Sequence, residues 1–121
     1  MSQGIEFYSQ SGDAICYSPD GQHIFLWNGK PVGYFHGEVV YSFSGRVLGW
    51  LGNGWLHDRN NKPALFSKSA RGGPFRPPTR ILSLKSLRQL LPLKSLRDLP
   101  QMKPHRKLDW SHLSGDSYFS Q

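Results

Sequence analysis

Short apolar and aromatic runs alternate with turn residues along the first 68 residues of the chain. Seven turn residues are spaced nine and then, five times, eight residues apart; they are Gly12, Gly21, Gly29, Gly37, Gly45, Asn53 and Asn61. Glycine and asparagine tolerate the positive φ angles of tight hairpin turns. The segments between them, such as residues 24–27 and 39–43, are rich in aromatic and β-branched side chains, which favour strands. The pattern therefore predicts eight short antiparallel strands.

A longer repeat of about sixteen residues underlies this spacing and appears when the chain is aligned on Gly12, Gly29, Gly45 and Asn61. An apolar residue and then a ring precede each turn residue, in the pairs Phe7-Tyr8, Ile24-Phe25, Val40-Tyr41 and Leu56-His57. A second ring follows each turn by five residues (Tyr17, Tyr34, Trp50, Phe66), and in three units a small residue precedes it (Cys16, Gly33, Gly49). One hairpin cannot bury its apolar face alone. We therefore expect four hairpins, over residues 5–68, to close around a pseudo-four-fold axis.

From residue 74 to residue 108 the chain has a period of three. One column is apolar and contains Phe75, Pro78, Ile81, Leu84, Leu87, Leu90, Leu93, Leu96, Leu99 and Met102, followed by His105 and Leu108. Polyproline II has three residues per turn, so this period favours an extended strap after a glycine-containing hinge at residues 69–73. Two short amphipathic helices, at residues 81–91 and 93–99 and ended by prolines, are the alternative. A tail that orders only on binding is a third possibility.

The net charge of +7 is concentrated in this tail. Residues 1–67 carry a net charge of −1, residues 68–107 carry +10, and residues 108–121 carry −2. A row of cations along a strap could follow the phosphates of RNA or DNA with little sequence preference. The candidate polyanion-binding residues are Arg76, Arg80, Lys85, Arg88, Lys94, Arg97, Lys103, Arg106 and Lys107.

The apolar column of the tail indicates that the tail packs against another surface, because a solvated linker does not need a leucine at every third position. We expect it to dock on the chain's own β-module, on a second copy or on a partner protein, with the basic column facing outward. The candidate docking residues are Leu84, Leu87, Leu90, Leu93, Leu96 and Leu99, together with Trp110, Leu113 and Phe119 of a terminal docking segment at residues 109–121.

Catalysis, a metal site and a bound cofactor are not expected. His57 occupies a ring position of the repeat and Cys16 a small-residue position, so packing explains both. No Cys-x-x-Cys pair, phosphate-binding glycine motif or nucleophile elbow occurs. A single cysteine, an N-terminus without a basic and apolar leader, and the lack of a run of about 20 apolar residues favour a cytoplasmic protein.

Residues 29–34 and 45–50 share the pattern Gly-x-x-apolar-small-aromatic, which resembles the bacterial four-fold beta-flower domain family. Residues 49–55, the Gly72-Gly73-Pro74 segment followed by Arg76-Pro77, and the ending at residues 110–119 carry the same resemblance, which extends over nearly the whole chain. It implies a fold of four β-hairpins and no particular activity. The chain departs from the family in its leucine-rich tail, where relatives carry smaller residues, and at Asp13-Ala14, which replaces a basic-proline pair.

Together these features predict a non-enzymatic interaction or assembly module that acts through its tail. Weakly specific nucleic-acid binding through the basic column is the alternative. Association of a helical tail with a membrane surface is the third possibility.

Overall fold

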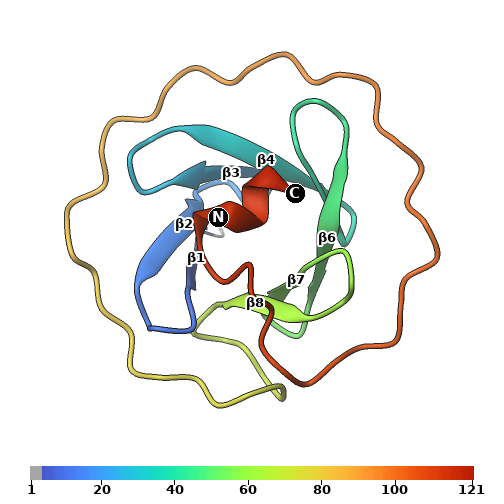
Figure 1. The fold of residues 1–121 in the computed structure, drawn as a ribbon. Helices are drawn as coiled ribbons and strands as arrows, with labels where there is room; N and C mark the ends of the chain where they lie inside the picture. Colours follow the sequence, from blue (N-terminus) through green and yellow to red (C-terminus); the bar gives the residue numbers. More distant parts are fainter. Residues whose placement is uncertain (1–3) are drawn as a thin grey trace.

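The computed structural model describes residues 4–121, and these form eight short strands that close into a barrel (Figure 1). The strands are β1 (Ile5–Tyr8), β2 (Ala14–Ser18), β3 (His23–Leu26), β4 (Pro31–His36), β5 (Val39–Tyr41), β6 (Val47–Gly52), β7 (Trp55–His57) and β8 (Pro63–Phe66). Each strand pairs antiparallel with its neighbours in sequence, and β1 pairs with β8 to close the sheet. The predicted all-β fold of four hairpins is confirmed.

All seven predicted turn residues have positive φ angles, between 53° at Asn53 and 92° at Gly45. Each of the four hairpins also has a register shift at the same point of the repeat, for example between Phe7 and Tyr8 and between Ile24 and Phe25. Such a bulge leaves one residue out of the strand pairing and increases the local twist. The repeat in the sequence is therefore also a repeat in backbone conformation.

The interior of the barrel contains the apolar residue that precedes each ring. Phe7, Ile24, Val40 and Leu56 are all fully buried in one core cluster. The small residues of the repeat allow close backbone contact, because a Cβ atom on Gly33 would lie 2.7 Å from the Tyr41 carbonyl oxygen. The rings of the repeat pair across neighbouring strands, outside this cluster, as Tyr17 with Phe25 and Tyr34 with Tyr41.

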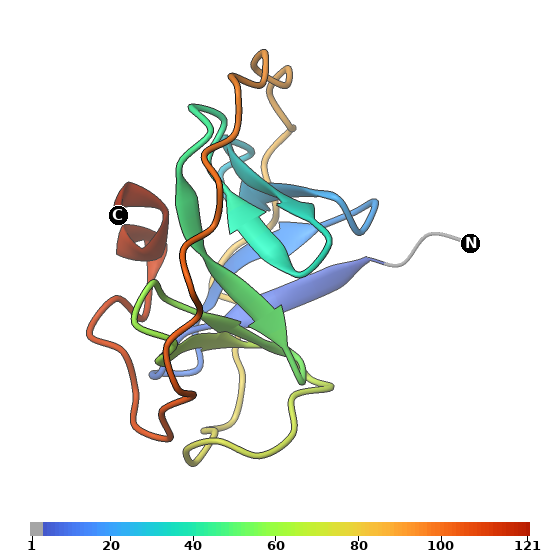
Figure 2. The same cartoon turned by 90° about the vertical axis from the view of Figure 1, so that its right-hand side faces the viewer.

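The tail from residue 74 to residue 108 runs around the outside of the barrel as an extended strap (Figure 1). Residues 81–91 and 93–99 contain no helix, so the helical alternative is wrong. An extended strap is long enough to run around the barrel, because 35 extended residues span roughly 110 Å. The same residues in an α-helix would span only about 50 Å. Figure 2 shows the strap crossing the outside of β6.

The strap is attached to the barrel at intervals of nine residues. Its backbone N–H groups donate to the carbonyl oxygens of the four turn residues: Arg80 to Gly12 (2.8 Å), Gln89 to Gly29 (2.9 Å), Asp98 to Gly45 (2.7 Å) and Lys107 to Asn61 (3.0 Å). Three triplets of the strap thus match one sixteen-residue unit of the barrel. The segment predicted as a hinge, residues 69–73, is held by the Trp55 indole, which donates to the Arg71 and Gly72 carbonyls (3.2 Å each).

The terminal segment returns to the barrel and covers one end of it with the 3₁₀ helix η1 (Asp116–Ser120) (Figures 1 and 2). Tyr118 is fully buried in the barrel core, and its hydroxyl donates to the His57 carbonyl (2.8 Å). The Ser111 hydroxyl donates to the buried carboxylate of Asp58 (2.5 Å). The end of the chain is therefore part of the folded core.

Candidate interaction surface

The cations of the strap face the barrel and lie over its ring pairs. Lys85 Nζ is 4.4 Å from the centre of the Tyr17 ring, and the Arg88 guanidinium is 5.7 Å from that of Phe25. Nine residues later, Lys94 and Arg97 take the same places over Tyr34 (4.8 Å) and Tyr41 (5.8 Å). A further nine residues on, Lys103 lies 5.8 Å from the Trp50 ring. Each contact lies within the range of a cation–π interaction.

Acidic side chains of the barrel add to this attachment. Lys85 pairs with Glu6 (2.6 Å), Lys103 pairs with Glu38 (3.7 Å), and Arg80 pairs with Asp13. Lys85 donates a hydrogen bond to Glu6 and so lowers the pKa of that carboxyl group. The strap is thus held by backbone hydrogen bonds, cation–π contacts and ion pairs.

The apolar column faces away from the barrel. Its central side chains, Leu84, Leu87, Leu90, Leu93, Leu96, Leu99 and Met102, are between 90% and 95% exposed. The expectation that the basic column faces outward is therefore wrong, and these leucines do not dock on the chain's own β-module. The physical reason is that the outer face of the barrel offers rings and carboxylates, which attract cations more strongly than they attract leucine. We call this row of seven side chains the leucine belt.

The third column of the strap, which comprises residue 74 and every third residue on to residue 107, supplies its backbone attachment. Every strap N–H that donates to the barrel backbone belongs to this column, at Arg80, Ser86, Gln89, Ser95, Asp98 and Lys107. The prolines of this column, Pro74, Pro77, Pro92 and Pro104, occupy places without such a donor. Since proline has no N–H to donate, it is compatible with those places only. The belt is therefore presented by a backbone with a defined register.

The other predicted polyanion-binding cations are also turned toward the chain itself. Arg76 lies over the Trp55 ring (5.7 Å) and donates to the Gly72 carbonyl (2.7 Å). Lys107 donates to the Asn60 carbonyl (3.1 Å). Arg106 lies close enough to His57 to affect its titration. Their side chains stay partly exposed, as Lys85 does with 37% of its side-chain surface.

The predicted docking residues of the terminal segment contact the chain's own barrel. Trp110 meets Trp55 and Phe66 edge-on, with ring centres 5.3 Å and 6.1 Å apart. Phe119 packs against the main core beside Tyr118, and Leu113 is half-buried. The predicted docking residues of the terminal segment therefore pack against the barrel, whereas the leucines of the belt are exposed to solvent.

His57 makes the stability of the folded chain dependent on pH. Burial, together with the positive charge of Arg106, lowers its pKa from 6.5 to about 4. The unfolded chain therefore takes up a proton on this histidine at a higher pH than the folded chain, so stability is full above pH 6.5 and falls as the pH drops toward 4. The expected slope is about 1.4 kcal/mol per pH unit in the free energy of unfolding. Urea titrations at several pH values measure it.

The His57→Phe variant should lose this slope, because phenylalanine carries no proton and fits a position that holds rings in the other three units. The exposed His112, changed to glutamine, is the matched control and should leave the slope unchanged. A slope that survives in His57→Phe would assign the pH dependence to other groups.

The remaining candidate features of residues 4–121 are the thiol, possible metal ligands and membrane-spanning helices. Cys16 is fully buried, and burial raises the pKa of its thiol. Within the described part of the chain, no group of three or more histidine, cysteine or acidic side chains is placed to hold a metal ion. No helix within residues 4–121 has the length and apolar character needed to span a membrane.

Sequence reasoning missed the nine-residue period and therefore the orientation of the strap. The signal is visible in the chain: Lys85, Lys94 and Lys103 are nine residues apart, and so are Arg88, Arg97 and Arg106. Cations recur every nine residues of the strap, and rings recur in each of the four units of the barrel. Matching these two repeats would have predicted that the cations lie over the rings. The period of three alone does not distinguish the inner column from the outer one.

Comparison with known proteins supports the fold. A family model described as 4-fold beta flower protein matches residues 5–119, which span both the barrel and the strap. No curated protein and no solved structure matches the chain.

Proposed function

Since the chain belongs to the 4-fold beta flower protein family, we propose that it uses this fold as a non-enzymatic interaction module that presents its leucine belt to a protein partner. The observation that carries this proposal is the exposure of seven large apolar side chains, each 90% or more, on a strap whose backbone is fixed to the barrel. Exposed apolar surface beyond scattered single residues marks interaction sites in soluble proteins.

The charge of the strap favours a partner other than a second copy. Residues 68–107 carry a net charge of +10, so two belts brought face to face would also bring two positive straps together. A partner with an apolar surface rimmed by carboxylates would meet the leucines and also the exposed parts of the cations beneath them. We therefore favour an acidic, amphipathic partner.

The spacing of the belt suggests the form of that partner. Successive leucines on an extended strap lie about 9 Å apart. One heptad of an α-helix rises about 10.5 Å, so apolar positions one heptad apart on a helix nearly match this spacing. The belt runs around the barrel, so a flat membrane would contact only part of it. A straight helix likewise contacts only part of the belt, so it is the heptad spacing that favours an amphipathic helix with acidic flanks as the partner.

A test compares wild type with a variant that carries glutamine at Leu84, Leu87, Leu90, Leu93, Leu96 and Leu99. The variant should fold as wild type does, because these side chains are at least 90% exposed. The probe is a labelled helical peptide with leucine at heptad spacing and glutamate on its flanks, followed by fluorescence anisotropy. We expect the variant to bind it at least about tenfold more weakly, the loss of about 1.4 kcal/mol of apolar contact.

A control peptide with lysine in place of glutamate should bind neither protein. Equal binding of the glutamate peptide to wild type and to the six-glutamine variant would contradict the proposal. Flotation of wild type with anionic vesicles, in the absence of peptide binding, would replace the protein partner by a membrane surface.

Nucleic-acid binding remains the second candidate, and one observation supports it. Arg88, Lys94 and Arg97 lie over aromatic rings, and a ring does not neutralise the charge of the cation above it. Their charge therefore remains available to a polyanion from the exposed side. Binding of mixed single-stranded RNA that weakens steeply with salt, and that the six-glutamine variant retains, would favour this function.

A further inference from the structure

The barrel closes less completely at one junction than at the other three. Strands β4–β5 and β6–β7 pair through three residues each, and β2–β3 pair through two, and each of these junctions ends in a hairpin turn. Strands β8 and β1 pair only through Phe66 and Tyr8. They lie at the two ends of the module, so no turn joins them. The four-fold symmetry is therefore broken at the β8–β1 junction.

Pairing inside the β7–β8 hairpin is the same as in the preceding units: the Ser67 N–H donates to the Gly54 carbonyl (2.9 Å), as Phe35 donates to Gln22 and Leu51 to Glu38. The difference follows β8, where the Ala70 N–H donates back to the Ser67 carbonyl (3.0 Å) and the chain leaves the sheet. Within the described part of the chain, residues 5–7 of β1 have no partner on β8.

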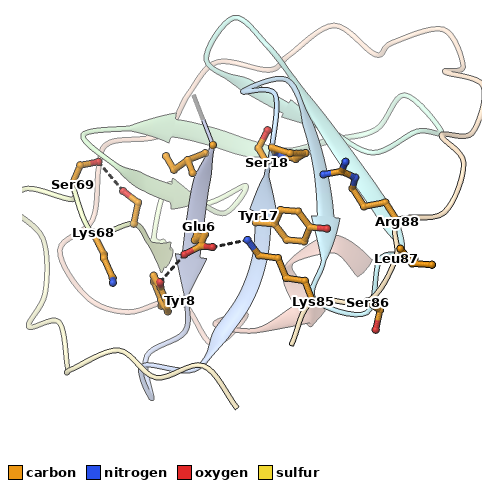
Figure 3. Close-up of a pocket in the computed structure, with 14 residues that line it drawn as sticks. Glu6, Tyr8, Tyr17, Ser18, Lys68, Ser69, Lys85, Ser86, Leu87 and Arg88 are labelled. Atoms are coloured by element: carbon orange, nitrogen blue, oxygen red, sulfur yellow. Dashed lines mark hydrogen bonds and ion pairs between the residues drawn. The ribbon is translucent and has the colours of Figure 1, made fainter. Parts of the chain in front are cut away.

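A cavity of about 640 Å³ lies beside this junction (Figure 3). It is bounded by the end of β8, the start of β1 and residues 85–88 of the strap. Its apolar lining includes Ile5, Tyr8 and Tyr17, and its rim carries Lys68, Lys85 and Arg88. Ligand sites for small molecules have this size and this combination of an apolar wall with a few polar groups.

Charge at the rim is positive. Glu6 is the acidic residue among the lining side chains, and Figure 3 shows it between Tyr8 and Lys85, which donate to it at 3.2 Å and 2.6 Å. Lys68 lies 6.0 Å from the Tyr8 ring centre on the other side. Three cations against one carboxylate leave a net charge of +2, in a concave place where the field of a cation is screened less than on an open surface.

We propose that this cavity binds a small organic anion, with its carboxylate or phosphate at Lys85, which lies between Lys68 and Arg88, and its apolar body against Ile5 and Tyr17 (Figure 3). Ion pairing with the ligand competes with the Glu6–Lys85 pair, so Glu6 limits the affinity for the anion. This site is distinct from the leucine belt, and the two proposals stand or fall separately.

The test uses the full chain, labelled with ¹⁵N, and two probes, phenyl phosphate and benzoate. Titration should shift the amide signals of Glu6, Lys68 and Arg88 and give a saturable dissociation constant. Lys85→Gln should weaken binding on the order of tenfold, for the loss of a charge-assisted hydrogen bond. Lys68→Gln and Arg88→Gln should each weaken it less, because these cations act on the anion through the local field. Glu6→Gln keeps the shape of the side chain and should strengthen binding, because Lys85 then offers its full charge.

The matched control is Arg97→Gln, because Arg97 occupies the place of Arg88 in the next nine-residue unit of the strap and does not line the cavity. It should leave binding unchanged. Equal losses in Arg88→Gln and Arg97→Gln, or weaker binding in Glu6→Gln, would overturn the proposal in favour of unspecific attraction to the strap. Inorganic phosphate that binds as tightly as phenyl phosphate would remove the role of the apolar wall and overturn it too.

Discussion

Replacing Gly45 by alanine is expected to destabilise the protein by about 3 kcal/mol or more and to detach the strap from the third hairpin. The Gly45 φ angle is 92°, which L-residues with a side chain rarely adopt. A Cβ atom there would also lie 2.0 Å from the Leu96 carbonyl oxygen and 2.9 Å from its carbon. Both atoms belong to the strap backbone, so relief of the clash requires the strap to move. Urea unfolding and tryptic cleavage at Arg97 measure the two effects.

The control is Gly37→Ala, at another hairpin turn. Gly37 also has a positive φ angle, 62°, but a Cβ atom there would meet no atom within 4 Å. Its substitution should cost only the conformational penalty, about 1 kcal/mol, and leave the strap resistant to trypsin. The difference between the two variants isolates the contribution of strap contact. If both unfold at the same urea concentration and the strap resists cleavage in both, the strap does not rest on the Gly45 turn.

The Tyr118→Ala substitution is expected to lower the free energy of unfolding by about 3–5 kcal/mol, the usual cost of deleting a buried aromatic ring. Tyr118 is fully buried in the barrel core, although it lies 52 residues beyond the last strand. Its loss would leave a cavity at one end of the barrel and release η1. Thermal or urea unfolding, followed by tryptophan fluorescence, gives the change.

The variant Tyr118→Phe separates the ring from its hydroxyl. Phenylalanine keeps the packing but removes the hydrogen bond to the His57 carbonyl, so we expect a smaller loss of about 1–3 kcal/mol. Ser117, which is exposed in the same helix, should tolerate alanine without measurable change. A Tyr118→Ala protein as stable as wild type would mean that the terminal segment does not close the barrel in solution.

Much of the barrel could be predicted from particular residues. The turn residues from Gly12 to Asn61 are glycine or asparagine because each of these places has a positive φ angle. The apolar residue before each ring, such as Phe7 or Ile24, is buried because its side chain packs in the core of the barrel. These constraints act within one hairpin and its neighbour, so they leave a regular trace in the chain.

The candidate surfaces could be predicted only in part. The period of three predicts three columns on the strap, and the absence of helix agrees with it. The general tendency of leucine to be buried then predicts the wrong column for the inner face. The β8–β1 junction leaves no periodic signal at all, because it joins the two ends of the module in space.

The sequence by itself thus determined the four-fold repeat, the turn positions and the extended strap, because each depends on local backbone preference and on spacing along the chain. Only the tertiary structure decided that the lysines and arginines face the rings, that the leucines face outward, and that one junction stays open. These outcomes depend on which surfaces meet. A ring pair such as Tyr17 with Phe25 forms only once strands from neighbouring hairpins lie side by side, and only then can it attract the cations of a strap more than sixty residues away.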